Sequence, residues 1–276
     1  MAGEEAFDKG FPTMSFDSIL VPHDGSPEAA KALGCAAWLA PRLRATLHVL
    51  ESSAEPASDL LAAIDAHQAK LVVMTARGAS ASAGVEPGRR MGRSGEVLIR
   101  ESTVPVVLLP VHYREALPWT SMLVAASGEP AADQALEAAL QLATALGLEL
   151  DVFYCESPRT KAQALGEYAD AVHHEYGERL QELVRRAAAR RPAEERGCIG
   201  QVLLCRGDPA DELLAQVAQR RAGVVALGWH GTLGAGRALL LKRLLDEAEC
   251  PLLLVRHAAR PASRLKVGEE LQRAAG

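Results

Sequence analysis

The sequence predicts an α/β protein made of two doubly wound parallel-sheet domains, and three observations carry this prediction. Runs of valine, leucine and isoleucine without polar alternation are typical of strands covered on both faces. These runs alternate with helical patterns, which is the order of right-handed βαβ units. The same order of elements occurs twice in 276 residues, a length that suits two small domains.

The first half begins with a short strand and a glycine-containing turn, ILVPHDGS at 19–26, which lead into a helix. A second strand, RATLHVLE at 44–51, runs directly into another helix and then into the buried strand LVVMTARG at 71–78. An amphipathic helix next passes through a proline into the closing strand VPVVLLP at 104–110. We therefore expect about four strands in this half.

The second half opens with SMLVAASGEPAADQAL at 121–136, which repeats SILVPHDGSPEAAKAL at 18–33. Its next strand is LELDVFYCE at 148–156. A polar, arginine-rich helix over about 160–190 and an additional strand, IGQVLLCRG at 199–207, have no counterpart in the first half. The second half should therefore have five strands, one more than the first.

The rest of the second half follows the first again. The segment 208–231 matches 55–78 as a helix feeding a buried strand, and 243–255 matches 96–110 as a helix followed by a closing strand. The polar segment VHYREALPWT, interrupted by Pro118, is the predicted linker. Domain boundaries follow from this pattern, with a truncated domain, a full domain and a flexible tail at 15–112, 117–257 and 258–276.

The charge and the cysteines exclude several classes of protein. The net charge is −5 and no lysine/arginine block is present, which argues against nucleic-acid or basic membrane-surface binding. The apolar runs are too short to span a bilayer and the first residues lack a secretory signal pattern, so we expect a cytoplasmic protein. Five cysteines without a C-x-x-C pair predict small core residues: Cys35, Cys155, Cys198, Cys205 and Cys250.

Together, ILVPHDGS, the glycine-ended LVVMTARG, the GRS segment at 92–94 and the closing VPVVLLP resemble the universal stress protein family. In the second half GDPADELL, VVALGWHG and CPLLLV resemble it as well. The resemblance implies a tandem member, with ATP or another adenine nucleotide as the ligand. Nucleotide-binding members of the family use an aspartate against the adenine and a G-x2-G-x9-G-[ST] loop for the ribose and phosphates. Such a loop places backbone amides and a helix N-terminus near phosphate oxygens.

In the first half, the resemblance assigns the candidate binding positions to Asp24, Gly78, Gly92 and Ser94. This half departs from the family pattern at several points. Thr75 replaces the first glycine of the loop, and Arg93 replaces the hydroxyl residue after Gly92. The strand that is missing here also removes one wall of the expected adenine pocket.

In the second half, the candidate positions are Ser127, Gly207, Gly228, Gly231, Gly234 and Gly236. The wall strand is present, but Ser127 stands where the family has its aspartate. Ala238 and Leu239 fall where the loop should close with G-[ST]. Trp229 has two interpretations, stacking on a base or packing against the neighbouring domain.

The resemblance also implies a pseudo-dimer in which the two closing strands pair edge to edge, and a homodimer in addition is compatible with it. Three functions remain open. The first is a non-enzymatic stress-response regulator that binds adenine nucleotide and signals to a protein partner. The second is a nucleotide-free interaction scaffold. The third is a slow ATPase, which has the least support because no base or metal-binding carboxylate pair is placed to activate water.

Overall fold

The computed structural model describes residues 15–51, 57–78, 91–114, 117–127, 130–156, 184, 198–231 and 238–256. The first half contains β1 (Ser18–His23), α1 (Pro27–Leu43), β2 (Thr46–Glu51), α2 (Ala57–Ala66), β3 (Leu71–Thr75), α3 (Arg93–Glu101) and β4 (Val106–Leu109). The second half contains β5 (Ser121–Ala126), α4 (Pro130–Leu146), β6 (Glu149–Glu156), β7 (Ile199–Arg206), α8 (Pro209–Arg220), β8 (Val224–Trp229), α9 (Leu239–Glu247) and β9 (Leu252–Arg256).

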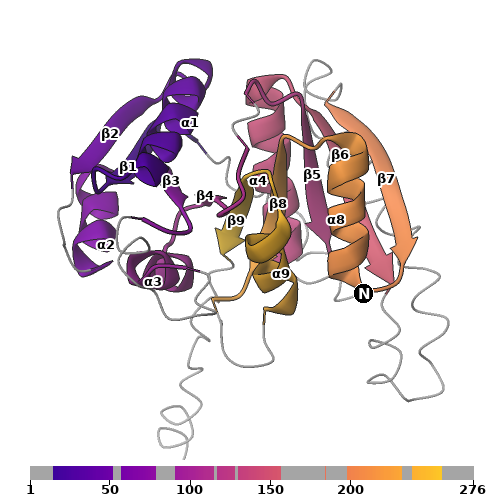
Figure 1. The fold of residues 1–276 in the computed structure, drawn as a ribbon. Helices are drawn as coiled ribbons and strands as arrows, with labels where there is room; N and C mark the ends of the chain where they lie inside the picture. Colours follow the sequence, from indigo (N-terminus) through magenta and orange to yellow (C-terminus); the bar gives the residue numbers. More distant parts are fainter. Residues whose placement is uncertain are drawn as a thin grey trace, which may run out of the picture.

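The strands of the described residues form one nine-stranded sheet in the order β2-β1-β3-β4-β9-β8-β5-β6-β7 (Figure 1). Strands within each half are parallel, whereas β4 and β9 pair antiparallel, with Val107 opposite Leu253. The predicted α/β class and the predicted edge-to-edge pairing of the closing strands are both confirmed. The first half contributes four strands and the second five.

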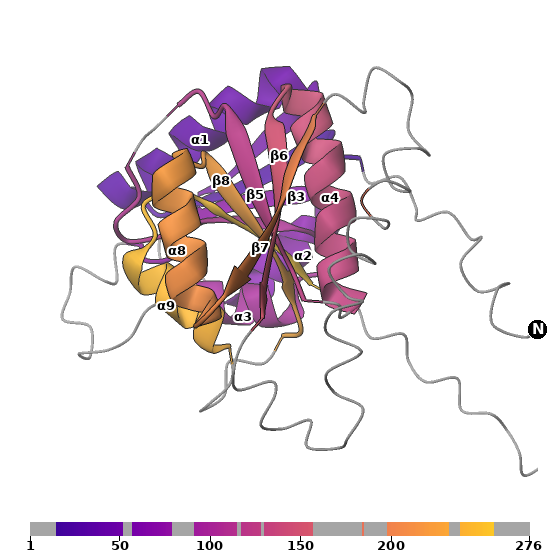
Figure 2. The ribbon, with the colours of Figure 1, turned by 90° about the vertical axis from the view of Figure 1, so that its right-hand side faces the viewer.

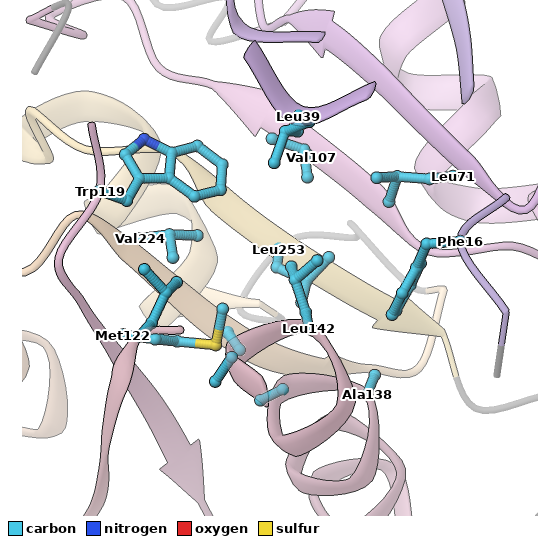
Figure 3. Packing of buried hydrophobic residues seen from close by; sticks show 14 of the residues in the cluster. Phe16, Leu39, Leu71, Val107, Trp119, Met122, Ala138, Leu142, Val224 and Leu253 are labelled. Atoms are coloured by element: carbon cyan, nitrogen blue, oxygen red, sulfur yellow. The ribbon is translucent and has the colours of Figure 1, made fainter. Parts of the chain in front are cut away.

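Two layers of helices cover this sheet (Figure 2). Helices α1 and α4 lie on one face, and α2, α3, α8 and α9 lie on the other. The core on the α1/α4 face runs across both halves, since Leu39 and Val107 of the first half pack in one cluster with Met122 and Leu253 of the second (Figure 3). The halves therefore share one core on this face.

Local sequence signals explain where helices α1 and α8 begin. Ser26 caps α1 by accepting a hydrogen bond from Ala29 N, and Pro27 occupies the first helical position. Asp208 caps α8 by accepting from Ala210 N and Asp211 N, and a proline follows it. Side-chain caps of this kind typically contribute about 1 kcal/mol each, and proline is preorganised for the first turn.

The segment predicted as a polar linker contains two buried aromatic residues. Trp119 is 3% exposed and its ring centroid lies 5.2 Å from that of Trp38 in α1. Tyr113 is buried in the same cluster. The expectation of a simple polar connection was therefore incomplete, because the segment adds apolar area to the core that the halves share.

Two of the five cysteines depart from the prediction that all are small core residues. Cys35, Cys198 and Cys250 are buried, whereas Cys155 and Cys205 are half-buried. The predicted helix over about 160–190 and the predicted tail at 258–276 lie outside the described residues, apart from the buried Val184. No helix within the described ranges combines the length and the apolar character needed to cross a membrane.

Candidate functional site

Asp24 and Gly78 lie together where β1 and β3 end. Asp24 Oδ1 accepts hydrogen bonds from Ser26 N (3.0 Å) and Ser26 Oγ (2.5 Å). The other carboxylate oxygen, Oδ2, lies so close to Gly78 that a Cβ built on this glycine would collide with it. Glycine is thus required for this approach of the carboxylate. The structure brings together two candidate residues that are far apart in the sequence.

Gly92 reaches the same edge of the first half. Its amide donates to Ala76 O over 2.9 Å, just before Gly78. Gly92 is the N-cap of α3 and offers no side-chain cap, while Ser94 follows in the first turn of the helix and is half-buried. The start of α3 therefore lies near the turn after β3, as the family pattern implies.

Gly228, a candidate binding position, lies in a close packing contact with helix α4. A Cβ at this position would collide with the carbonyl group of Ala131 and the amide of Ala132, in the first turn of α4. Glycine is needed here so that helix α4 can pack directly on strand β8. The side of Gly228 that faces α4 is thus filled by protein backbone.

The other candidate positions of the second half are spread over several local contacts. Ser127 is exposed after β5. Gly207 accepts a hydrogen bond from Cys155 Sγ (3.6 Å), and a Cβ on it would lie 2.9 Å from Glu212 Oε1. Gly231, with φ +80°, faces Arg256 Nε and the carbonyl of Arg100. Gly234 and Gly236 lie outside the described residues.

Trp229 packs against the first half, which was one of its two interpretations. Its Nε1 donates to Ile99 O over 2.6 Å, and Arg256 Nη1 donates to Glu101 O over 2.9 Å. The last carbonyls of a helix have no partner within the helix, so these two donors satisfy the C-terminal end of α3. We call Trp229 and Arg256 the α3 clasp. No local pattern indicates that Arg256 takes part, because its partner is a backbone carbonyl 155 positions away.

A small cavity of about 250 Å³ lies between β8 and α9. Its walls are mainly aliphatic and are formed by Leu227, Gly228, Trp229, His230, Ala238, Leu240, Leu241 and Leu254. This volume is below the range of roughly 300–1,000 Å³ that is typical of small-molecule pockets. The size and the apolar walls of this cavity do not match a nucleoside triphosphate.

Charged side chains lie near the carboxyl ends of the strands in both halves. In the first half, Arg77 precedes Gly78 and the exposed Arg93 begins α3. In the second half, Asp208 and Glu212 lie near Cys155 and contribute to the rise of its pKa, after burial and Cys205. Phosphate oxygens are attracted by guanidinium groups and repelled by carboxylates. Arg77 and Arg93 therefore give the first half two guanidinium groups near its candidate residues that can attract a phosphate.

The parallel strands, the helices on both faces and the glycine-containing turns at strand ends define a doubly wound α/β protein of the Rossmann-like class. A family model for the universal stress protein family matches residues 15–61 and 118–256, so the chain belongs to this family. The unmatched residues between these two segments include β3, α3 and β4, and thus Gly78 and Gly92.

Solved structures agree on the fold. A putative universal stress protein from Pseudomonas aeruginosa UCBPP-PA14 aligns with TM-score 0.60 and 17% identity, covering 88% of this chain and 94% of its own. A universal stress protein from Archaeoglobus fulgidus DSM 4304 aligns with TM-score 0.59 and 17% identity, covering 89% and 99%. A functionally unknown protein from Pseudomonas aeruginosa PAO1 aligns with TM-score 0.60 and 15% identity, covering 88% and 94%. No curated protein matches the sequence.

Proposed function

We propose that this universal stress protein is a non-enzymatic, cytoplasmic stress-response regulator that binds ATP or a related adenine nucleotide in its first half. The observation that carries the proposal is the contact between Asp24 and Gly78 at the ends of β1 and β3. The hydrogen bond from Gly92 to Ala76 adds the start of α3 to the same edge. Ligands of doubly wound proteins bind at the carboxyl ends of the parallel strands, where these residues lie.

Each group at this edge has a defined part in the proposal. The Asp24 carboxylate accepts a hydrogen bond from the adenine amino group. The first amides of α3, which has no side-chain cap, and the guanidinium groups of Arg77 and Arg93 face the phosphates. Because Ser26 holds one carboxylate oxygen with two hydrogen bonds, Asp24 is better suited to be a fixed acceptor than a mobile base. We therefore propose binding without hydrolysis.

The second half has a structural part in this proposal. Gly228 is used for helix packing, and Trp229 is used in the α3 clasp. The second half, which has the five strands, thereby supports the first half, which binds the nucleotide. We propose that nucleotide binding changes the surface of the turns that follow β1 and β3. A protein partner then recognises this changed surface.

Calorimetric titration of ATP into the wild type, Asp24→Ala and Ser127→Ala tests the proposal. Ser127 follows β5 as Asp24 follows β1, so it provides the matched control. Loss of one strong hydrogen bond to adenine should weaken binding by at least about tenfold in Asp24→Ala, equal to about 1.4 kcal/mol. Ser127→Ala should bind as the wild type does. The opposite ranking would move the site to the second half.

Two further results would replace the proposal. If the wild type gives no heat of binding and releases no nucleotide on denaturation, the protein is a nucleotide-free scaffold. The use of Gly228 for packing against Ala131 is the observation that favours this second candidate. If the wild type releases phosphate from ATP and Asp24→Ala does not, the protein is a slow ATPase.

A further inference from the structure

Two cysteines that are far apart in the sequence stand opposite each other in the sheet. Cys155 in β6 and Cys205 in β7 are register partners on parallel neighbouring strands. Residues in this relation point to the same face and have Cα atoms about 4.8 Å apart. This separation is within the window of roughly 4.4–6.8 Å that a disulfide requires. Both side chains pack against the core cluster on the α8 side of the sheet.

The pair differs from the other cysteines in its accessibility. Cys155 and Cys205 are half-buried, and β7 is the outermost strand among the residues that the structure describes. Cys35, Cys198 and Cys250 are buried. A small oxidant can thus approach the pair from the sheet edge, whereas the other thiols lie within the packed interior.

The two thiols also interact electrostatically. Burial, and after it the neighbouring Cys205, raise the pKa of the Cys155 thiol to about 11. Burial, and after it the Glu212 carboxylate, raise the pKa of Cys205, although the Arg220 guanidinium acts in the opposite direction. Cys155 Sγ donates to Gly207 O over 3.6 Å. At neutral pH both groups are therefore thiols, and Cys205 is the better placed of the two to react first.

We propose that Cys155 and Cys205 are a reversible dithiol–disulfide pair whose co-reactant is a low-molecular-weight disulfide. The Cys205 thiol loses its proton and the thiolate attacks one sulfur of the oxidant, which releases one small thiol and leaves a mixed disulfide. The Cys155 thiol then loses its proton and attacks the Cys205 sulfur, releasing the second small thiol. The protein is oxidised by two electrons and the oxidant is reduced to two thiols.

Oxidation has a local structural effect. The hydrogen bond from Cys155 to Gly207 is lost, because the disulfide has no S–H donor. Gly207 immediately precedes Asp208, the N-cap of α8. The bridge therefore ties β7 to β6 and alters the turn that leads into α8. A half-exposed bridge at a sheet edge is also readily reduced again.

Oxidised glutathione added to the folded, reduced full-length protein tests the inference. Mass spectrometry under non-reducing conditions should show the loss of two hydrogens and a link between Cys155 and Cys205, and dithiothreitol should reverse both. Cys198→Ser is the matched control, since Cys198 lies in the same segment as Cys205 and should not affect the link. In Cys155→Ser, the mixed disulfide should persist as a glutathione adduct on Cys205.

Two results would overturn the inference. One is a wild-type protein whose mass is unchanged under conditions that oxidise a free dithiol peptide. The other is a link that survives in Cys205→Ser, or that joins different cysteines. Because the first result comes from the wild type alone, the test does not depend on the folding of any variant.

Discussion

The two halves of this protein have the same fold but use the glycines near their strand ends in different ways. In the first half, Gly78 leaves room for the carboxylate of Asp24 at the end of a neighbouring strand. In the second half, Gly228 leaves room for the backbone of α4, and Gly231 faces the α3 clasp. A glycine near the end of a buried strand therefore indicates that another group approaches it closely. That group determines whether the result is a ligand site or a packing contact.

The first prediction concerns the two glycines directly, and it has the largest expected effect. Gly228→Ala should destabilise the protein by about 3 kcal/mol or more, because its Cβ meets rigid backbone in α4. Gly78→Ala should cost about 1 kcal/mol or less in the absence of ligand, since only the end of the Asp24 side chain must move. Urea unfolding of both variants measures the difference. Equal losses would contradict the distinction between the halves.

The second prediction compares thiols from the two halves at different pH values. The Cys155–Cys205 pair should react with oxidised glutathione about tenfold faster at pH 8 than at pH 7, because the reactive thiolate is a minor species at neutral pH. Cys35 is buried, and burial raises its pKa to about 12. It should remain unmodified at both pH values. Mass spectrometry of quenched samples gives the rates. If Cys35 were modified before the Cys155–Cys205 pair, the pair would not be the more accessible of the two sites.

The third prediction concerns the contact between the halves. Trp229→Phe should destabilise the protein by about 1–3 kcal/mol, because the buried carbonyl of Ile99 loses its donor. Trp119→Phe is the matched control. Within the described part of the chain the Trp119 indole nitrogen is buried without a hydrogen-bond partner, so only packing changes. Thermal unfolding should therefore give a lower Tm for Trp229→Phe than for Trp119→Phe. The reverse order of Tm values would argue against the α3 clasp.

The fourth prediction has the smallest expected effect. Arg256→Met keeps most of the side-chain length but removes the hydrogen bond to Glu101 O, which is exposed to solvent. Exposed interactions of this kind contribute about 0.5–1 kcal/mol. Urea unfolding should show a loss of that size. A loss larger than that of Trp229→Phe would place the main energy of the clasp in the arginine.

Sequence reasoning was sufficient for the fold because the order of strands and helices repeats along the chain. The family resemblance assigned Asp24 and Gly78 to one candidate site, and the two lie together because both follow buried strands whose carboxyl ends meet. Sequence reasoning could not give the role of Gly228, which depends on how closely α4 packs on β8. That distance is a property of tertiary packing and has no local pattern.

The cysteine pair was missed for a related reason. The register of β6 against β7 is tertiary, so nothing local to either cysteine indicates the other. One signal was present, since VFYCE and VLLCR both place a cysteine next to the last residue of a strand. Aligning the ends of strands expected to be neighbours would have put the two thiols side by side. The α3 clasp had no comparable signal, because Ile99 and Glu101 take part through their backbone carbonyls.

The antiparallel pairing of β4 with β9 fixes which way each half faces. Since strands within each half are parallel to one another, the turns after β1 and β3 open at one end of the continuous sheet, and those after β5 and β8 open at the other. The two ends are separated by a strand length, on the order of 20 Å. A small ligand bound at one end therefore cannot contact the turns at the other end.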